Sequence, residues 1–150
     1  MGTFSGYSAI CLAEGLAEGG KLYTFEINDE MEDFTRPWIE GSSVADKIDF
    51  RIGDANVEAP KLGIHFDLAF VDGDKRTYLE TYEMVLSILN PGGYILADNT
   101  LWDGHVIDPA YDKAHQTQGI RKFNDFIAQD PRVEVVILPL RDGLTLIRKK

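Results

Sequence analysis

The stretch FDLAFVDGDKRTYLETYEMVLSILNPGGYILADN, residues 66–99, decides the fold class. Its apolar run Phe66–Val71 predicts a buried strand. The apolar residues of Thr77–Leu89 recur with helical spacing, and the Asn-Pro-Gly-Gly run that follows predicts the end of that helix. Tyr94–Ala97 then predicts a second strand. This segment therefore reads as a strand, a helix and a strand.

The rest of the chain alternates in the same way. Further strands are expected at Lys21–Ile27, Ile48–Ile52, Val133–Leu138 and Leu144–Ile147, and further helices at Tyr7–Leu16, Asp29–Glu40 and Gln118–Gln129. Pro37 should end or kink its helix, and Trp102–Thr117 reads as a long loop. Strands that alternate with helices predict an α/β fold with a mostly parallel sheet. The last two strands are joined by too few residues for a parallel crossover, so this pair should be antiparallel.

The composition limits the function classes. The chain has 150 residues, with 25 acidic and 15 basic side chains and a net charge of −10, which suits a single domain over residues 1–150. This charge argues against a nucleic-acid partner, because binding to phosphate backbones depends on an excess of Lys and Arg. No apolar run approaches the roughly 20 residues of a membrane span, so no membrane partner is expected. Without a secretory signal, and with Cys11 as its single cysteine, the chain should be cytoplasmic.

Polar side chains follow four of the expected strands. They are Glu26, Asp54, Asp72 and the pair Asp98-Asn99. Each one alone is explained by the preference of such residues for turns and helix caps. Because open α/β sheets bind ligands at the carboxyl ends of their strands, four such ends together favour a ligand site.

The glycine-rich segment GTFSGYS, Gly2–Ser8, opens the first expected helix. Glycine lets the backbone approach a ligand closely, and a helix N-terminus favours an anionic group. The G-x-x-x-G spacing differs from the G-x-G-x-x-G of dinucleotide sites, and a glycine-capped helix start explains it equally well. Glu26 ends the next strand 20 residues after Gly6, where a carboxylate can accept both hydroxyls of an adenosine ribose. A solvated glutamate is the alternative for this position.

Asp72, Asp98 and Asn99 form the candidate metal site. If their strands are neighbours, the strand ends lie about 4.8 Å apart, and two carboxylates and an amide oxygen converge. Such hard oxygen ligands suit Mg²⁺. A pair of helix caps without an ion is the alternative. Lys75 could serve as a base beside a metal, although a surface lysine is the simpler interpretation from the residues alone.

Four stretches together carry a family resemblance. They are GTFSGYSA (Gly2–Ala9), LYTFEIN (Leu22–Asn28), FDLAFVDGDKRTY (Phe66–Tyr78) and LNPGGYILADNTLW (Leu89–Trp102). In this combination the chain resembles the metal-dependent class I S-adenosylmethionine O-methyltransferases of the caffeoyl-CoA and catechol type, and Arg141–Lys149 resembles the close of their bacterial members. The resemblance covers essentially the whole chain. It implies a Rossmann-like, doubly wound sheet, a phenolic acceptor and a homodimer.

The resemblance also implies roles for matching positions. The cofactor would be bound by Gly2, Thr3, Gly6, Tyr7, Ser8, Glu26, Ile27, Asp54, Ala55 and Asp72. The divalent ion would be held by Asp72, Asp98 and Asn99. Lys75 would be the catalytic base, with Asp72 as its catalytic neighbour. A catechol bound to the metal loses its proton to Lys75, and the phenolate attacks the methyl carbon of the cofactor.

One departure from the family stands at the start of the chain. The family sheet has the order 3-2-1-4-5-7-6, and Met1 stands where its first, central strand should end. The sequence therefore predicts two unpaired strand edges, in a fragment or a product with a misplaced start. A catalytically impaired module that only folds or oligomerises is thus one alternative. A nicotinamide-dependent oxidoreductase is another, disfavoured by the glycine spacing and the Asp98-Asn99 pair.

Overall fold

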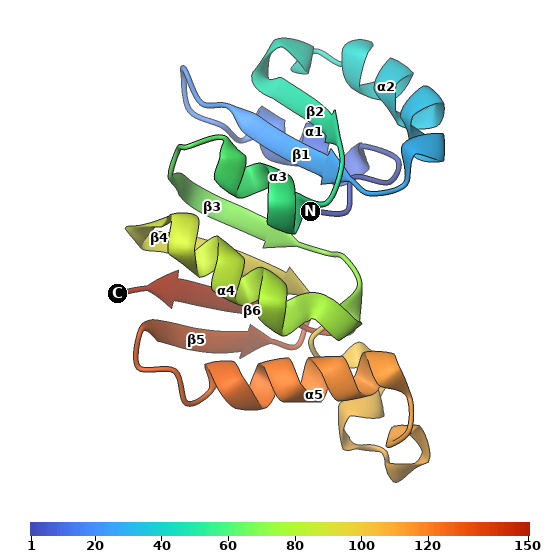
Figure 1. The fold of residues 1–150 in the computed structure, drawn as a ribbon, viewed down its shortest axis with the longest axis vertical. Helices are drawn as coiled ribbons and strands as arrows, with labels where there is room; N and C mark the ends of the chain where they lie inside the picture. Colours follow the sequence, from blue (N-terminus) through green and yellow to red (C-terminus); the bar gives the residue numbers. More distant parts are fainter. The chain divides into compact units, whose positions relative to one another are not determined.

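The computed structural model describes residues 1–150 (Figure 1). The chain divides into two compact units, Met1–Lys61 and Leu62–Lys150. The single-domain organisation expected from the sequence stays a prediction. None of the helices is both long enough and apolar enough to cross a membrane.

The first unit is a two-stranded parallel sheet with helices. Its elements are α1 (Tyr7–Glu14), β1 (Leu22–Glu26), η1 (Asp29–Met31), α2 (Glu32–Glu40), η2 (Ala45–Lys47), β2 (Ile48–Ile52) and α3 (Ala55–Lys61). β1 pairs with β2 from Leu22 opposite Ile48 to Glu26 opposite Ile52. A small apolar core holds the helices on these strands, built by Ala13, Ile39, Val44 and Ile48. This packing places the end of β1 beside the end of β2.

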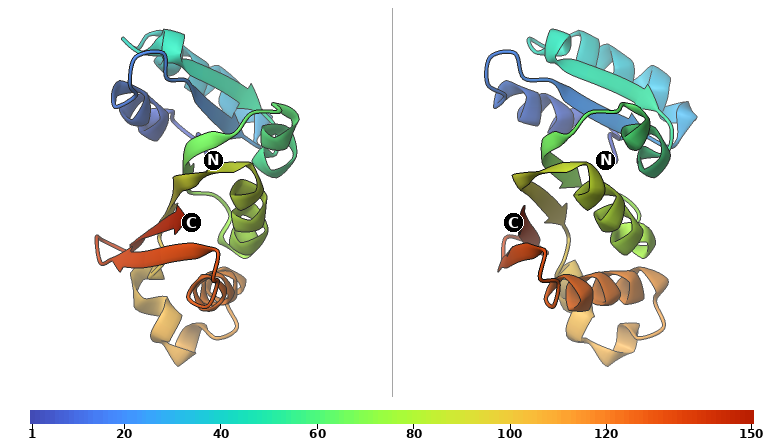
Figure 2. Two further views of the ribbon diagram at one scale, coloured as in Figure 1. Left: turned by 90° about the vertical axis from the view of Figure 1, so that its left-hand side faces the viewer. Right: turned by 60° about the vertical axis from the view of Figure 1, so that its left-hand side comes forward.

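The second unit is a four-stranded sheet with the order β3-β4-β6-β5. Its elements are β3 (Phe66–Val71), η3 (Lys75–Thr77), α4 (Tyr78–Ile88), β4 (Leu89–Asp98), η4 (Trp102–Ile107), η5 (Pro109–Tyr111), α5 (His115–Ile127), β5 (Val133–Leu138) and β6 (Leu144–Lys149). β3 and β4 are parallel, whereas β6 is antiparallel to both β4 and β5. Figures 1 and 2 show α4 and α5 on the same face of this sheet. The expected mixed α/β architecture with an antiparallel final pair is confirmed.

The register of β3 against β4 places two candidate site residues next to each other. The last pair of this ladder is Val71 opposite Ala97. Asp72 directly follows Val71, and Asp98, the last residue of β4, directly follows Ala97, so the two lie side by side at the carboxyl edge of these strands. Buried apolar side chains on β4, β6 and the two helices keep the strands in this register, among them Ile95, Ala97, Ile147, Val85 and Phe123. The neighbouring strand ends expected from the sequence are thus present.

The expected unpaired strand edges are also present. Among the strands, β1 pairs only with β2, and β3 pairs only with β4. On the other side of β1, the backbone N–H groups of Gly2 and Thr3 donate to the carbonyl of Phe25, each at 3.2 Å.

The alternative that Pro37 ends its helix is wrong. Pro37 lies inside α2, which continues to Glu40. A proline removes only one N–H from a helix, and its own carbonyl still accepts from the N–H of Gly41 at 3.0 Å. Cys11, the single cysteine, is exposed. The buried residues of α1 are Ala9 and Ala13, and Cys11 lies midway between them on the opposite face.

Helix α3 was missed, because Ala55–Lys61 is short and contains Pro60. The signal that could have found it is Asp54. Its carboxylate accepts from the N–H of Asn56 at 2.8 Å, as a helix cap does. The long loop at residues 102–117 is also partly ordered, because η4 and η5 lie in it.

Candidate functional site

The glycine-rich loop of the first unit has a backbone that favours glycine. Gly2 and Gly6 have φ angles of 86° and 81°. A Cβ on Gly6 would lie 3.0 Å from Cγ1 of Ile39, so the loop passes too close to α2 for a side chain. The loop is fixed from inside by the buried hydroxyls of Thr3 and Thr24, which are 2.8 Å apart. The segment is therefore a shaped turn, and it leads into the N-terminus of α1.

Glu26 lies at the centre of the polar groups in this unit. Its side chain is 8% exposed. One carboxylate oxygen accepts from the N–H of Phe4 at 2.8 Å, and the other accepts from the N–H of Asn28 at 3.0 Å. The N–H of Gly53 donates to the Glu26 carbonyl at 2.7 Å. The structure thus brings the glycine loop, Glu26 and the start of α3 at Asp54 together, and the solvated alternative for Glu26 is wrong.

The remaining predicted cofactor positions of this unit surround that group. Tyr7 and Ile27 carry large side chains that are 75% and 73% exposed. Ser8 follows Tyr7 in the first turn of α1, and Ala55 opens α3. Exposed side chains such as these can contact a ligand that has rings and hydroxyls.

Lys75 occupies the corresponding edge of the second unit. It is 5% exposed, so the surface-lysine interpretation is wrong. Its Nζ lies 3.0 Å from Oδ1 of Asp72 and 2.7 Å from the hydroxyl of Tyr78. The ring of Trp102 lies 5.9 Å from the same nitrogen. A buried amine held by a carboxylate and a phenol is suited to proton transfer.

Asp98 and Asn99 stand beside this lysine at the end of β4. Burial raises the pKa of the Asp98 carboxyl, and the negative charges of Asp72 and Asp142 raise it further. The N–H of Asn99 and the charge of Lys75 lower this pKa, but the raising effects are larger. That N–H donates to Oδ1 of Asp98 at 2.8 Å. A carboxylate whose charge is disfavoured by two neighbouring carboxylates marks a place where a cation would be stabilised.

Asp142 is the site residue that the sequence reasoning missed. Nδ2 of Asn99 donates to its Oδ2 at 2.7 Å, which leaves the amide oxygen of Asn99 as a free acceptor. The Asp142 carbonyl also accepts from the N–H groups of Leu101 at 2.8 Å and Trp102 at 3.0 Å. In the sequence, Asp142 belongs to a short turn between two strands. Only the pairing of β6 with β4 shows that this turn lies next to Asn99.

A hollow of about 680 Å³ opens on these groups. Its lining residues are Phe70, Asp98, Asn99, Asp103, Leu140, Arg141, Asp142 and Leu144. No group of three His, Cys, Asp or Glu side chains is arranged as a metal site by itself. The expected set differs in kind, because it combines Asp72 and Asp98 with the amide oxygen of Asn99. Its all-oxygen donors and its excess negative charge fit a hard divalent cation.

Comparison with known proteins shows the family of this chain. The family model described as O-methyltransferase matches residues 1–150. This chain belongs to the O-methyltransferase family. It is 39% identical to caffeoyl-CoA O-methyltransferase 1 of Eucalyptus globulus, over 99% of this chain and 65% of that protein. It is 40% identical to caffeoyl-CoA O-methyltransferase 2 of Zea mays, over 99% of this chain and 61% of that protein.

Solved O-methyltransferases share the fold. The enzyme from Bacillus cereus, in complex with SAH, is 33% identical and superposes with a TM-score of 0.91 over 99% of this chain and 71% of that one. The enzyme from Streptomyces achromogenes involved in tomaymycin synthesis, in complex with SAM, is 29% identical, with a TM-score of 0.90 over 99% and 70%. The chain thus spans less than two thirds of the length of the two plant relatives.

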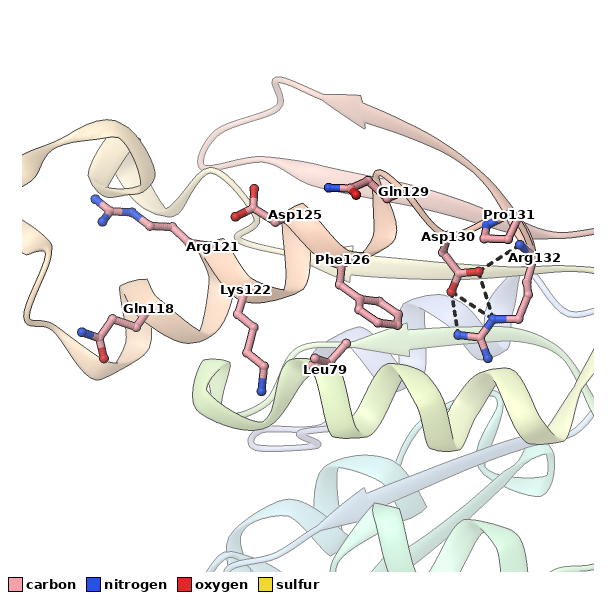
Figure 3. A pocket seen from close by; sticks show the side chains of 10 residues that line it. All are labelled: Leu79, Gln118, Arg121, Lys122, Asp125, Phe126, Gln129, Asp130, Pro131 and Arg132. Atoms are coloured by element: carbon pink, nitrogen blue, oxygen red, sulfur yellow. Dashed lines mark hydrogen bonds and ion pairs between the residues drawn. The ribbon is translucent and has the colours of Figure 1, made fainter.

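A second hollow, of about 910 Å³, lies apart from the predicted cofactor, metal and base residues. It runs between α4 and α5 (Figure 3), and its lining residues are Leu79, Gln118, Arg121, Lys122, Asp125, Phe126, Gln129, Asp130, Pro131 and Arg132. At one end Arg132 and Asp130 are paired, with Nη2 and Oδ2 2.6 Å apart. None of the predicted cofactor, metal or base positions lines this hollow.

Proposed function

We propose that this chain is an S-adenosylmethionine-dependent O-methyltransferase that uses a divalent cation and methylates a catechol-like or caffeoyl-type hydroxyl. The observation that carries the proposal is the buried amine of Lys75, held between Asp72 and Tyr78 beside Asp98 and Asn99. Family membership and the cofactors bound by the solved relatives support it.

The first unit would bind the cofactor. In this proposal the loop from Gly2 to Ser8 receives the methionine part, and Glu26 accepts the hydroxyls of the ribose. Both carboxylate oxygens of Glu26 already receive a backbone N–H, which fixes their direction and leaves further lone pairs free. Asp54 and Ala55 would flank the adenine at the start of α3, while Ile27 would cover it.

The second unit would bind the cation through Asp72, Asp98 and the amide oxygen of Asn99. Asp142 supports this assignment, because it engages the amide nitrogen of Asn99. When bound, the cation would make a coordinated phenol more acidic. Mg²⁺ is the ion proposed, since it prefers oxygen ligands and keeps positions open for substrate.

Lys75 would take the proton from the acceptor hydroxyl. In this role the amine would act in its neutral form, whose lone pair receives the proton. The phenolate oxygen then forms a bond to the methyl carbon while the methyl–sulfur bond breaks. The electron pair stays on sulfur, so the products are the methyl ether and S-adenosylhomocysteine. The chain's contribution is to orient the two reactants and to hold the proton acceptor at a fixed place.

The competing functions lack comparable support. A nicotinamide-dependent oxidoreductase would be expected to carry the G-x-G-x-x-G loop, which this chain lacks. An impaired, purely structural module would not require a buried lysine at a strand end. The phenolic acceptor, the homodimer and the cytoplasmic location remain predictions of the sequence.

The direct test is methyl transfer by the whole chain and by its Asp98→Ala variant. The assay supplies S-adenosylmethionine, Mg²⁺ and either catechol or caffeoyl-CoA. Loss of one cation ligand should lower the rate by about 100-fold or more, because metal coordination stabilises the transition state by several kcal/mol. Asp125→Ala, an exposed carboxylate on α5, is the matched control and should keep the wild-type rate. Full activity of Asp98→Ala in excess chelator would contradict the metal role.

A further inference from the structure

Tyr78 carries a buried phenol at the point where β3 and β4 end. The residue is 1% exposed. Its hydroxyl lies 2.7 Å from Nζ of Lys75, 3.1 Å from the carbonyl of Val71 and 2.9 Å from the carbonyl of Asp98. One oxygen atom therefore contacts the candidate base and the backbone of both strands that carry the candidate cation ligands.

The partners of the Tyr78 hydroxyl determine which hydrogen bonds it donates and which it accepts. A phenol has one proton to donate, and its oxygen can accept. The two carbonyls can only accept, so the phenolic proton is committed to Val71 or Asp98. The oxygen is then left to accept from the amine of Lys75.

Of the two polar neighbours of the Lys75 amine, Tyr78 is the anchored one. The side chain of Asp72 is 42% exposed. The ring of Tyr78 packs against the buried ring of Phe123, with centroids 5.4 Å apart. A group that is fixed in the core holds the Lys75 amine in place more firmly than a group that faces solvent.

We propose that Tyr78 is a positioning residue for methyl transfer. Its hydroxyl holds the amine of Lys75 at the carboxyl edge of the sheet and ties the ends of β3 and β4 to that amine. This inference rests on the proposed function, in which Lys75 receives the proton of the acceptor.

The test is Tyr78→Phe, which removes one oxygen and keeps the ring against Phe123. We expect kcat to fall by about 10- to 100-fold, because a small displacement of a catalytic group costs that much. The KM values for acceptor and cofactor should stay within about twofold, since Tyr78 binds neither substrate. Equal changes in KM and kcat, or an unchanged kcat, would overturn the proposal.

Tyr82→Phe is the matched control. Tyr82 is also 1% exposed and also packs against Phe123, at 6.0 Å between centroids. Its hydroxyl donates to Oδ2 of Asp130 at 2.8 Å, away from Lys75. This variant loses a buried hydrogen bond of similar kind, so its melting temperature should also fall, but its kcat should remain at the wild-type level. A similar loss of kcat in both variants would show a merely structural effect.

A second readout is independent of turnover. In ¹H–¹⁵N NMR of lysine side chains, a held and shielded Nζ gives a resolved signal, which Lys75→Arg would assign. We expect this signal in the wild type and in Tyr82→Phe, and its shift or loss in Tyr78→Phe. An unchanged signal would contradict the contact. If the wild-type chain transfers no methyl group, the proposed function fails and the positioning role of Tyr78 in methyl transfer fails with it. The NMR result still decides whether the contact between Tyr78 and Lys75 exists.

Discussion

Gly6 gives the glycine-rich loop its path past α2. Its φ of 81° lies in the left-handed region, and a Cβ there would stand 3.0 Å from Ile39. Gly6→Ala should therefore lower the free energy of unfolding by about 1–3 kcal/mol, through backbone strain and the contact with Ile39. Chemical denaturation measures this change, and calorimetry with S-adenosylhomocysteine should show weaker binding.

Gly19→Ala separates the two causes. Gly19 has a φ of 76°, but nothing lies within 4 Å of the position of its Cβ. This variant should therefore lose stability through backbone strain alone, by about 1 kcal/mol, and should keep its cofactor affinity. If both variants bind the cofactor equally well, the loop does not need its close approach to α2.

Arg121 connects α5 with the segment that contains η4 and η5. Its guanidinium donates to the carbonyls of Val106, His105 and Asp108, at 2.8, 3.0 and 3.0 Å. It also pairs with Oδ1 of Asp112 at 2.6 Å. Only the planar fork of an arginine can reach several acceptors at once, so one side chain orders a segment that has little core of its own.

Arg121→Lys should therefore loosen this segment while α5 stays folded. Amide hydrogen exchange over residues 105–112 should become faster by about tenfold or more, since the loss of each such hydrogen bond costs about 1 kcal/mol or more. Lys122→Arg, at the exposed neighbouring position, is the control and should leave exchange unchanged. Unchanged exchange in Arg121→Lys would contradict the role of Arg121.

At the same scale, the strands with apolar runs were predictable. Ile48–Ile52, Phe66–Val71 and Val133–Leu138 have the bounds expected from the sequence. Ile48–Ile52 alternates apolar and charged residues, whereas the other two are mainly apolar, and both patterns are local signals of a strand. Whether Pro37 would end α2 was not predictable, because tertiary packing of a helix overrides a local preference.

For the whole molecule, the site was predictable where strand order determines it. Asp72, Asp98 and Asn99 could be grouped because parallel strand ends meet at one edge of a sheet. The burial of Lys75 could not be predicted, because it depends on packing. The contact of Asp142 with Asn99 could not be predicted either, because these residues are far apart in the sequence. The spacing of residues along the chain does not predict which polar side chain becomes buried.

The central claim for the whole molecule is that it binds S-adenosylmethionine. Calorimetric titration with S-adenosylhomocysteine, with NAD as the control ligand, tests it most directly. We predict saturable binding of S-adenosylhomocysteine with a Kd in the micromolar range and no binding of NAD, and this binding should weaken in Glu26→Ala, which removes the carboxylate proposed to bind the ribose. Absence of S-adenosylhomocysteine binding, or equal binding of NAD, would contradict the account.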